Sequence, residues 1–409
     1  MKILFITYFF PPFNTIGAVR TGKTAEKLLE LGHDVRVISA DDQNFHPNLK
    51  SKFPESKVYR TSWLDFDRPI NLFTSKEKVE QQLSIGKKFS IKSLLIGFFQ
   101  KTYNFFFNKP DKHIGWYPYA VKKSKSIHEE FKPDVIFSSA TPYTSHLIAK
   151  IIKANYKTPW VAELRDLWAD NHYMKPSRIN NYLEKTTLSK ADAIVTVSDP
   201  LVERLKEKYE MPVYKIQNAF DKSDYEHIQK SVDNNKLKIL YTGNLYAGKR
   251  DPSPLFDAIQ KSPKLRDNVK IDFYGNKSPF LEGLIKKYNL EKIVEYKGLV
   301  SRDEIVNLQK QADILLLLTW NNPLEKGVLT GKLFEYIGSA KPILSIGAIH
   351  DSASNLIEKY NFGLASNSPS EIESFILDLN NFKYSSENRS LFERTSQVKK
   401  LISILENVI

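Results

Sequence analysis

The chain of 409 residues contains no cysteine. This absence excludes disulfide bonds, thiolate nucleophiles and cysteine metal ligands, and it fits a protein of a reducing compartment. No run of about 18 uninterrupted apolar residues occurs, which argues against a membrane-spanning helix. The apolar residues after Met1 stop at Pro11-Pro12 without a cleavage site, too early for a secretory signal. We therefore expect a cytoplasmic protein.

Several sequence motifs are missing as well. GxGxxG does not occur, so dinucleotide-dependent redox chemistry loses support. No Asp-x-Asp pair lies in a loop suited to clamp a metal ion. We therefore expect no metal and no other cofactor.

Positive charge is abundant. Sixty basic residues stand against 47 acidic ones, for a formal net charge of +13. Such an excess indicates an anionic partner, which bulk charge alone leaves open: a nucleotide diphosphate, an anionic bilayer surface or nucleic acid. Nucleic acid ranks last, because it explains the charge but none of the motifs described below.

The length and the apolar pattern predict two α/β domains. A chain of 409 residues exceeds the roughly 250 to 300 residues at which one hydrophobic core stops growing, and 41% apolar residues suffice for two cores. Short continuous apolar runs alternate with amphipathic stretches, as in parallel sheets covered on both faces. The expected strands are 2–7, 34–39, 135–138, 160–162 and 193–197 in the first domain, and 238–242, 270–274, 294–297, 314–318 and 342–346 in the second.

The domain limits follow from a polar segment without apolar periodicity. This segment, Asp221–Lys236, predicts the connection between a first domain at 1–221 and a second domain at 237–385. Residues 386–409 carry apolar side chains at helical spacing and predict a terminal helix.

Residues 75–112 interrupt the α/β pattern. They contain eight lysines and three acids among many leucines and phenylalanines, which predicts an insertion of helices that are basic on one side and aromatic on the other. Such helices suit the headgroup region of an anionic membrane, where a polyprenyl-linked acceptor would be presented. The alternative is that the phenylalanines pack on the first domain.

Two loops in the first half follow expected strands. Gly17, at a helix start, is a candidate for close backbone approach to an anion, with Arg20 as charged support. The second loop combines two acids, a cation and an indole that suit sugar hydroxyls and a sugar face: Glu163, Arg165, Asp166 and Trp168. The alternatives are an ordinary strand-to-helix turn and a structural Arg165–Asp166 ion pair.

The second half carries the more specific pattern. Gly243 and Gly248 precede Lys249 and Arg250 in a strand-end loop, a combination that suits a diphosphate. Further on, a glycine-containing loop opens a helix at Thr330–Lys332, where backbone N–H groups attract anions. Glu335, one turn inside that helix, would meet ribose hydroxyls. The alternatives are a solvent-facing basic turn and local pairing of Glu335 with Lys332 or Lys341.

At these residues the sequence resembles the GT-B glycosyltransferases, in particular glycosyltransferase family four, formerly called group 1 transferases. The matching motifs are Gly32-His33-x-Val35-x-Val37, Pro133-Asp134-Val135, Arg165-Asp166-x-Trp168, Gln217-Asn218-Ala219-Phe220-Asp221, Gly243 with Lys249, Tyr296-Lys297-Gly298 and Lys332-Leu-Phe-Glu335-Tyr336. The last block resembles the subset found in bacterial surface-polysaccharide synthesis, such as capsule or O-antigen. The resemblance implies two Rossmann-like domains that face each other across a cleft, with the C-terminal helix crossing back to the first domain.

The resemblance also implies roles for individual residues. Lys249, with Arg250, would stabilise the leaving diphosphate, and Glu335 would bind the ribose. The implied donor site contains Gly17, Gly243, Asn244, Lys249, Val328, Leu329, Thr330, Gly331, Lys332 and Glu335. The acceptor side would contain Glu163, Arg165, Asp166, Trp168 and His146.

Three positions depart from the family pattern. Gly327 stands where the first acid of a paired-glutamate motif is expected, and Asn244 stands where an arginine commonly follows Gly243. The histidine often found after the strand at 133–137 is replaced by serines, of which Ser139 could still approach the sugar through its backbone. His146 is the nearest histidine.

The expected function is therefore metal-independent transfer of a sugar, with retention, from a nucleoside diphosphate, most simply UDP, to a saccharide or lipid-linked acceptor. The expected location is the cytoplasm, including the inner face of the cell membrane. Two alternatives stay open: a nucleotide-sugar 2-epimerase of the same fold, and a catalytically silent scaffold subunit.

Overall fold

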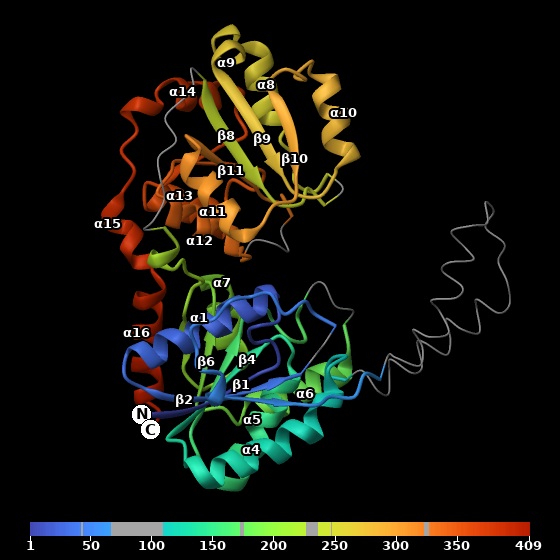
Figure 1. Ribbon diagram of the computed structural model, residues 1–409, viewed down its shortest axis with the longest axis vertical. Coiled ribbons are helices and arrows are strands. Elements are labelled where there is room, and N and C mark those ends of the chain that lie inside the picture. Colours follow the sequence, from blue (N-terminus) through green and yellow to red (C-terminus); the bar gives the residue numbers. More distant parts are fainter. Residues whose placement is uncertain (42–43, 67–108, 172–175, 226–235, 247, 323–326) are drawn as a thin grey trace, which may run out of the picture. The chain divides into compact units, whose positions relative to one another are not determined.

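The computed structural model describes residues 1–41, 44–66, 109–171, 176–225, 236–246, 248–322 and 327–409. By its internal contacts the chain divides into two compact units (Figure 1). Unit 1 comprises Met1–Val197, Leu201–Ile216 and Lys400–Ile409, and unit 2 comprises Ser198–Pro200 and Gln217–Lys399. The predicted basic and aromatic insertion at 75–112 lies outside the described residues up to position 108, and so does most of the predicted connection at 221–236.

Unit 1 contains a parallel sheet with strand order β3-β2-β1-β4-β5-β6-β7 among its described residues. The strands are β1 (Lys2–Thr7), β2 (Asp34–Ala40), β3 (Val58–Thr61), β4 (Val135–Ala140), β5 (Trp160–Leu164), β6 (Ala193–Thr196) and β7 (Val213–Lys215). The helices are α1 (Ile16–Glu30), α4 (Tyr117–Phe131), α5 (Thr144–Tyr156), α6 (Arg178–Leu188) and α7 (Asp199–Lys208).

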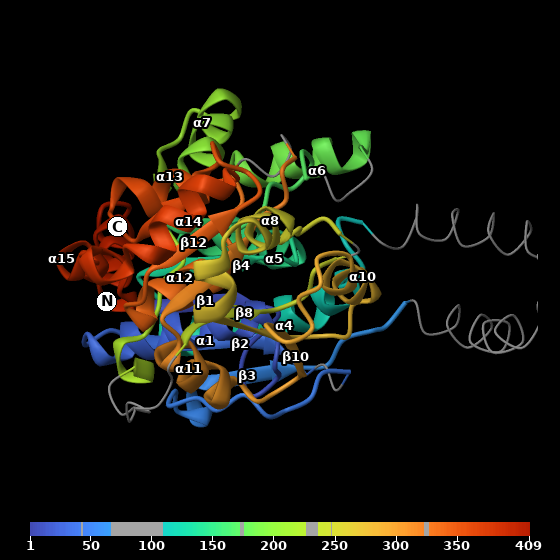
Figure 2. The ribbon, with the colours of Figure 1, turned by 90° about the horizontal axis from the view of Figure 1, so that it is seen from above.

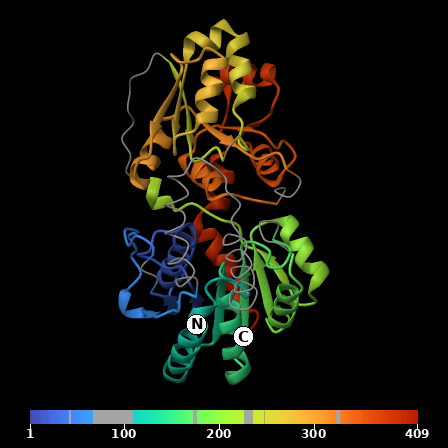
Figure 3. The same cartoon turned by 90° about the vertical axis from the view of Figure 1, so that its right-hand side faces the viewer.

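Helices cover both faces of this sheet. Leu4 and Ile6 of β1 belong to a core cluster with Ile127 of α4 and Ile148 of α5. Because successive side chains of a strand point to opposite faces, Ile3 and Phe5 face the other layer, where α1 lies (Figure 1). Figure 3 shows α4 in teal beside α5 in green. β1 is buried on both faces, which explains its continuous apolar sequence.

Unit 2 contains a second parallel sheet, of order β10-β9-β8-β11-β12-β13. The strands are β8 (Leu237–Thr242), β9 (Val269–Tyr274), β10 (Val294–Gly298), β11 (Ile314–Leu318), β12 (Ile343–Ile346) and β13 (Gly363–Ala365). The helices are α8 (Ser253–Lys261), α9 (Pro263–Asn268), α10 (Pro279–Lys287), α11 (Arg302–Gln311), α12 (Gly331–Ser339), α13 (Ser352–Lys359), α14 (Pro369–Leu377) and α15 (Ser386–Arg389). A further helix, α16 (Arg394–Glu406), begins in unit 2 and continues into unit 1. Core clusters lie on both sides of the sheet, and α8 packs beside α14 (Figure 2).

The two sheets confirm the predicted pair of doubly wound α/β domains. The ten expected strands are present, and three strands that the sequence did not indicate are added: β3, β7 and β13. All three lie at sheet edges. Edge strands are short and half exposed, so they lack the continuous apolar run on which the strand prediction depended.

The C-terminal segment differs from the single helix expected at 386–409. It forms α15, a short 3-10 turn at Ser390–Phe392 and α16. Phe392 is 1% exposed and belongs to a core cluster of unit 2, so the chain bends to bury it. The last ten residues, Lys400–Ile409, group with unit 1, where the two chain ends lie near each other (Figure 3).

Candidate functional site

A buried ion pair occupies the carboxyl edge of the unit 1 sheet. Arg20 of α1 donates from Nε and Nη2 to Oε1 of Glu163 at 3.1 and 2.7 Å, and Ser139 Oγ donates to Oε2 at 2.6 Å. Arg20 Nη2 also donates to the carbonyl of Ile216 at 3.0 Å. Burial by itself raises the pKa of Glu163, but the two guanidinium groups of Arg20 and Arg165 outweigh it and hold that pKa below its usual value. Glu163 is therefore an ionised buried carboxylate.

Arg165 is held by backbone carbonyls. Its Nε donates to Ala140 O at 2.8 Å and its Nη2 donates to Thr141 O at 3.0 Å. A methyl group added at Gly17 would lie 3.3 Å from both terminal nitrogens of Arg165. The loop around Gly17, predicted to approach an anion, thus lies against a guanidinium group, and the glycine permits this close contact.

The other acceptor-side candidates divide into buried and exposed groups. Trp168 is fully buried and stacks on Tyr143 with ring centroids 4.9 Å apart. His146 is also fully buried, with Nδ1 2.8 Å from Ser138 Oγ, and burial lowers its pKa to about 3. Asp166 alone of these is exposed. Direct acceptor contact stays a prediction for all of them, and the structure gives the buried ones packing roles.

In unit 2, Gly243 ends β8 and makes room for a lysine. Its φ is +127°, a region that L side chains rarely adopt, and an added Cβ would lie 2.5 Å from Lys332 Nζ. Lys332 belongs to the first turn of α12, and its Nζ lies 4.2 Å from the ring centroid of Tyr241. Gly243 and Lys332, which are 89 positions apart in sequence, therefore bring the loop after β8 and the start of α12 together at the sheet edge.

Two further cations come from the loop after β8. Lys249 is exposed, with its Nζ 4.1 Å from the ring centroid of Trp320, which follows β11. The Arg250 guanidinium donates to the carbonyl of Asn244 at 3.2 Å and lies 4.7 Å from the Tyr246 ring. Among the described residues, neither side chain has a carboxylate within ion-pair distance. Aromatic rings and a backbone carbonyl contact the Lys249 and Arg250 side chains, so their positive charge has no counter-charge among the described residues.

Asn244 stands where the family has an arginine, and it has a structural task here. Its Oδ1 accepts a hydrogen bond from the backbone N–H of Asn276 at 3.1 Å, and its carbonyl accepts one from the Tyr241 hydroxyl at 2.9 Å. Asn244 therefore joins the loops after β8 and β9. It contributes no charge.

The N-terminus of α12 supplies free backbone donors. Thr330 is the N-cap residue, its side chain accepts no capping hydrogen bond, and the first turn contains no acidic residue. Unpaired N–H groups at such an end favour an anion. Val328, Leu329 and Gly331, which the sequence placed in the same anion site, lie in this half-buried approach to the helix.

Glu335 lies one turn further into α12. Its Oε1 is 3.8 Å from Nη2 of Arg302, a residue of α11 that the sequence did not single out, and both side chains are about one-third to two-fifths exposed. A long, solvated pair of this kind contributes little to stability and leaves the carboxylate accessible. Arg302 and Trp320 could not be found from sequence, because Arg302 begins α11 and Trp320 follows β11, and neither residue belongs to a motif.

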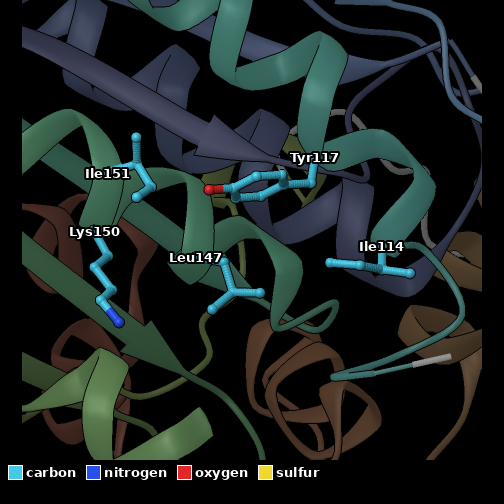
Figure 4. A pocket seen from close by; sticks show the side chains of 5 residues that line it. All are labelled: Ile114, Tyr117, Leu147, Lys150 and Ile151. Carbon is cyan, nitrogen blue, oxygen red and sulfur yellow. The ribbon is translucent and has the colours of Figure 1, made fainter. Parts of the chain in front are cut away.

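Two further features limit the choice of site. No cluster of three or more His, Cys, Asp or Glu residues suited to a metal occurs in the described part of the chain. A pocket of about 200 Å³ in unit 1 is lined by Ile114, Tyr117, Leu147, Lys150 and Ile151 (Figure 4). With one charged side chain it is too small and too apolar for a nucleotide sugar.

No described helix combines the length and the apolar character that crossing a membrane requires.

Comparison with known protein families gives two adjoining matches. Residues 17–217 match the model described as glycosyl transferase 4-like domain, and residues 223–380 match the model described as glycosyl transferases group 1. Among curated protein sequences, the chain has no significant match.

Solved structures show the same fold at low identity. A sucrose-phosphate synthase from Thermosynechococcus elongatus is 13% identical, with a TM-score of 0.64 and coverage of 100% of this chain and 98% of that one. Anabaena HepE in complex with UDP is 16% identical, with a TM-score of 0.63 and full coverage of both chains. The UDP-GlcNAc 2-epimerase of Methanocaldococcus jannaschii is 13% identical, with a TM-score of 0.55 and full coverage of both. At these identities the likeness shows the fold, which is GT-B.

Proposed function

Because the chain belongs to the group 1 glycosyltransferases, we propose that it transfers a sugar from a nucleoside diphosphate to a hydroxyl group, with retention at the anomeric carbon. One observation carries the donor half of this proposal. Lys249, Arg250 and Lys332 gather at the carboxyl edge of the unit 2 sheet beside the N-terminus of α12, without a carboxylate partner for Lys249 or Arg250 among the described residues. Open α/β sheets bind ligands at this edge.

The proposed chemistry follows from where charge develops. When the bond to the sugar breaks, negative charge grows on the leaving diphosphate, and fixed cations and helix N–H groups stabilise it. Lys249 and Arg250 act in this role, and the amides of Val328 to Lys332 hold phosphate oxygens. These groups neutralise the charge themselves, so we propose that no metal is needed. Glu335 accepts hydrogen bonds from the ribose hydroxyls.

UDP is the diphosphate that we propose first. HepE is described in complex with UDP and glucose, and a pneumococcal O-GlcNAc transferase is described in complex with UDP and GlcNAc. Both share the fold with this chain at TM-scores of 0.61 and 0.60. A hexose is accordingly the first donor sugar to test.

Unit 1 is the proposed acceptor side. Asp166 follows β5 and is exposed, while the buried Glu163 pairs with Arg20 and accepts a hydrogen bond from Ser139. We propose a saccharide or polyprenyl-linked acceptor of surface-polysaccharide synthesis, reached by peripheral binding to an anionic membrane through residues 75–112. Replacing Lys87, Lys88, Lys92 and Lys101 together should lower binding to anionic liposomes. Unchanged binding would remove the membrane part of the proposal only.

The test of the donor proposal combines binding with turnover. Purified protein is screened for thermal stabilisation by nucleoside diphosphate sugars, because a ligand that binds the folded state raises its apparent stability. The best donor is then incubated with saccharide acceptors, and the anomeric configuration of the product is read by NMR. Retained configuration supports the proposal, and inversion contradicts it.

A 2-epimerase is the second candidate, since one shares the fold. It needs acid and base groups in the donor cleft, whereas the groups gathered in unit 2 are cations that suit a leaving diphosphate. Release of free epimerised nucleotide sugar without an acceptor would favour the epimerase. Donor binding without any turnover would favour a scaffold subunit.

A further inference from the structure

Lys332 has an unusual environment for a lysine. The ammonium nitrogen has essentially no accessible surface and no hydrogen-bond partner within the described residues. It lies over the Tyr241 ring and fills the space that Gly243 leaves free. A buried amine without an acceptor is unfavourable, because the charged form loses its hydration without compensation.

The charges that face this amine make its protonation harder. Arg250, from the loop after β8, repels the ammonium form, and the amine itself lies in the first turn of α12, where the helix dipole is positive. Glu335, on the next turn of α12, is the acid that favours it, and Tyr241 contributes only a ring face. Burial, helped by Arg250, lowers the pKa of Lys332 to about 7.

A diphosphate would reverse this balance. The proposed phosphate position lies between the loop after β8 and the N-terminus of α12, and these are the two segments that surround the Lys332 amine. An anion there would give the ammonium both a counter-charge and acceptors. Asn244, where the resemblance implies an arginine, provides no charge, and its Oδ1 and carbonyl oxygens accept hydrogen bonds from Asn276 and Tyr241.

We propose that Lys332 takes up a proton from solvent when the nucleoside diphosphate binds, and so becomes the cation that Asn244 does not supply. The neutral amine of the empty site accepts one proton on its nitrogen lone pair. The resulting ammonium donates hydrogen bonds to diphosphate oxygens when the flexible Lys332 side chain turns from the Tyr241 ring toward the ligand. This inference rests on the proposed function, since it requires that a diphosphate occupies the site in unit 2.

Calorimetry with UDP as the probe measures the proton directly. Titrations at pH 8 in buffers of different ionisation enthalpy give the number of protons bound with the ligand. A pKa of about 7 in the empty site predicts uptake of about 0.9 proton at this pH. Between pH 7.5 and pH 8.5, where the diphosphate of UDP is ionised and its uracil ring is still largely neutral, affinity should fall about eightfold, because less of the free protein carries the proton in advance.

Matched variants separate this effect from ordinary electrostatics. Lys332→Arg carries a permanent charge, so it should bind UDP with no proton uptake and with affinity that is flat over the same pH range. Lys332→Gln should bind weakly, also without a pH slope. Lys286→Gln on α10, which removes an exposed lysine, should behave as wild type. Thermal unfolding of each variant verifies that it is folded.

Each outcome bears on one of the two proposals. UDP binding by wild type without proton uptake, or uptake that persists in Lys332→Arg, overturns the role of Lys332 and leaves the donor site standing. Failure of the wild type to bind UDP, GDP, dTDP or ADP at any pH overturns the donor site and this inference with it. Uptake in the wild type that is lost in both Lys332 variants establishes the coupling.

Discussion

Breaking the buried ion pair of unit 1 should lower the free energy of unfolding, because one buried charge loses its counter-charge. The pair joins Arg20 and Glu163, whose side chains are 7% and 5% exposed. Glu163→Leu leaves the Arg20 guanidinium buried without this carboxylate, while the Ile216 carbonyl still accepts a hydrogen bond from its Nη2. Removing one partner of such a pair costs about 3 to 5 kcal/mol, because the other charge stays buried and uncompensated.

The double variant Arg20→Met/Glu163→Leu should be more stable than either single variant. It removes both charges, and replacement of a buried pair by apolar side chains of similar size is often neutral. Ser139 Oγ and the Ile216 carbonyl lose their partners, which costs about 1 to 3 kcal/mol. We therefore expect a loss of about 2 kcal/mol for the double variant and about 4 kcal/mol for Glu163→Leu.

Tryptophan fluorescence during urea unfolding can follow unit 1 separately. Of the five tryptophans, Trp320 alone lies in unit 2, so a Trp320→Phe background restricts the signal to Trp63, Trp116, Trp160 and Trp168. A 4 kcal/mol loss corresponds to a melting temperature lower by about 8 to 16 °C for a unit of this size. The reasoning is refuted if Glu163→Leu costs under 1 kcal/mol, or if the two single effects simply add in the double variant.

Three further predictions concern the donor site and pH. Gly243→Ala should weaken UDP binding at least about tenfold and lower the free energy of unfolding by about 1 to 3 kcal/mol, because φ of Gly243 is +127° and an added Cβ would displace Lys332. Gly283→Ala on α10 is the control and should have neither effect, because an added Cβ there meets nothing within 4 Å. Glu335→Gln should lower the donor affinity measured by calorimetry about tenfold, because it weakens the proposed ribose contact. Glu304→Gln, at an exposed position on α11, is its control. Intact donor binding and sugar transfer in Glu335→Gln would contradict the ribose role. His146, whose pKa is depressed to about 3 from 6.5, favours folding fully above pH 6.5 and progressively less below it, so acidification from pH 7 to pH 5 should cost about 2 kcal/mol through this residue alone. The urea midpoint of His146→Gln should accordingly depend less on pH than that of wild type.

The interior strands could be predicted because they are buried on both faces. β1 and β11 read as continuous apolar sequences, and no polar face competes with that pattern. The edge strands β3, β7 and β13 could not be predicted, because their few residues are half exposed and their pairing depends on a neighbour already in place. The break at Ser390–Phe392 was missed for a similar reason, since Leu391 keeps the helical spacing with Val398 while the tertiary packing of Phe392 bends the chain.

The candidate site residues could be predicted where the signal is local in sequence. Gly243, Lys249 and Glu335 could be proposed from sequence, because a glycine at a strand end and a helix opening are local signals. The partners of Glu163 could not, since Arg20 lies 143 positions away and Ser139 lies 24 positions away. The burial of Trp168 and His146 could not be settled from sequence, because the same residue types serve as packing or as sugar contacts.

The two units differ in whether the protein supplies partners for their cationic side chains, and this difference supports the roles proposed for the units. In unit 1, Arg20 faces a carboxylate and Arg165 faces two backbone carbonyls, so the protein itself satisfies these guanidinium groups and they fix the loops around them. In unit 2, Lys249 and Lys332 face aromatic rings, and the Lys332 amine has no acceptor in the described residues. The buried Lys332 amine weakens the fold in its charged form, because its desolvation is not offset, whereas the exposed Lys249 stays hydrated. An anionic ligand would remove that cost when it binds, so this difference supports the diphosphate site proposed in unit 2 and a scaffold role for the satisfied cations on the proposed acceptor side, unit 1.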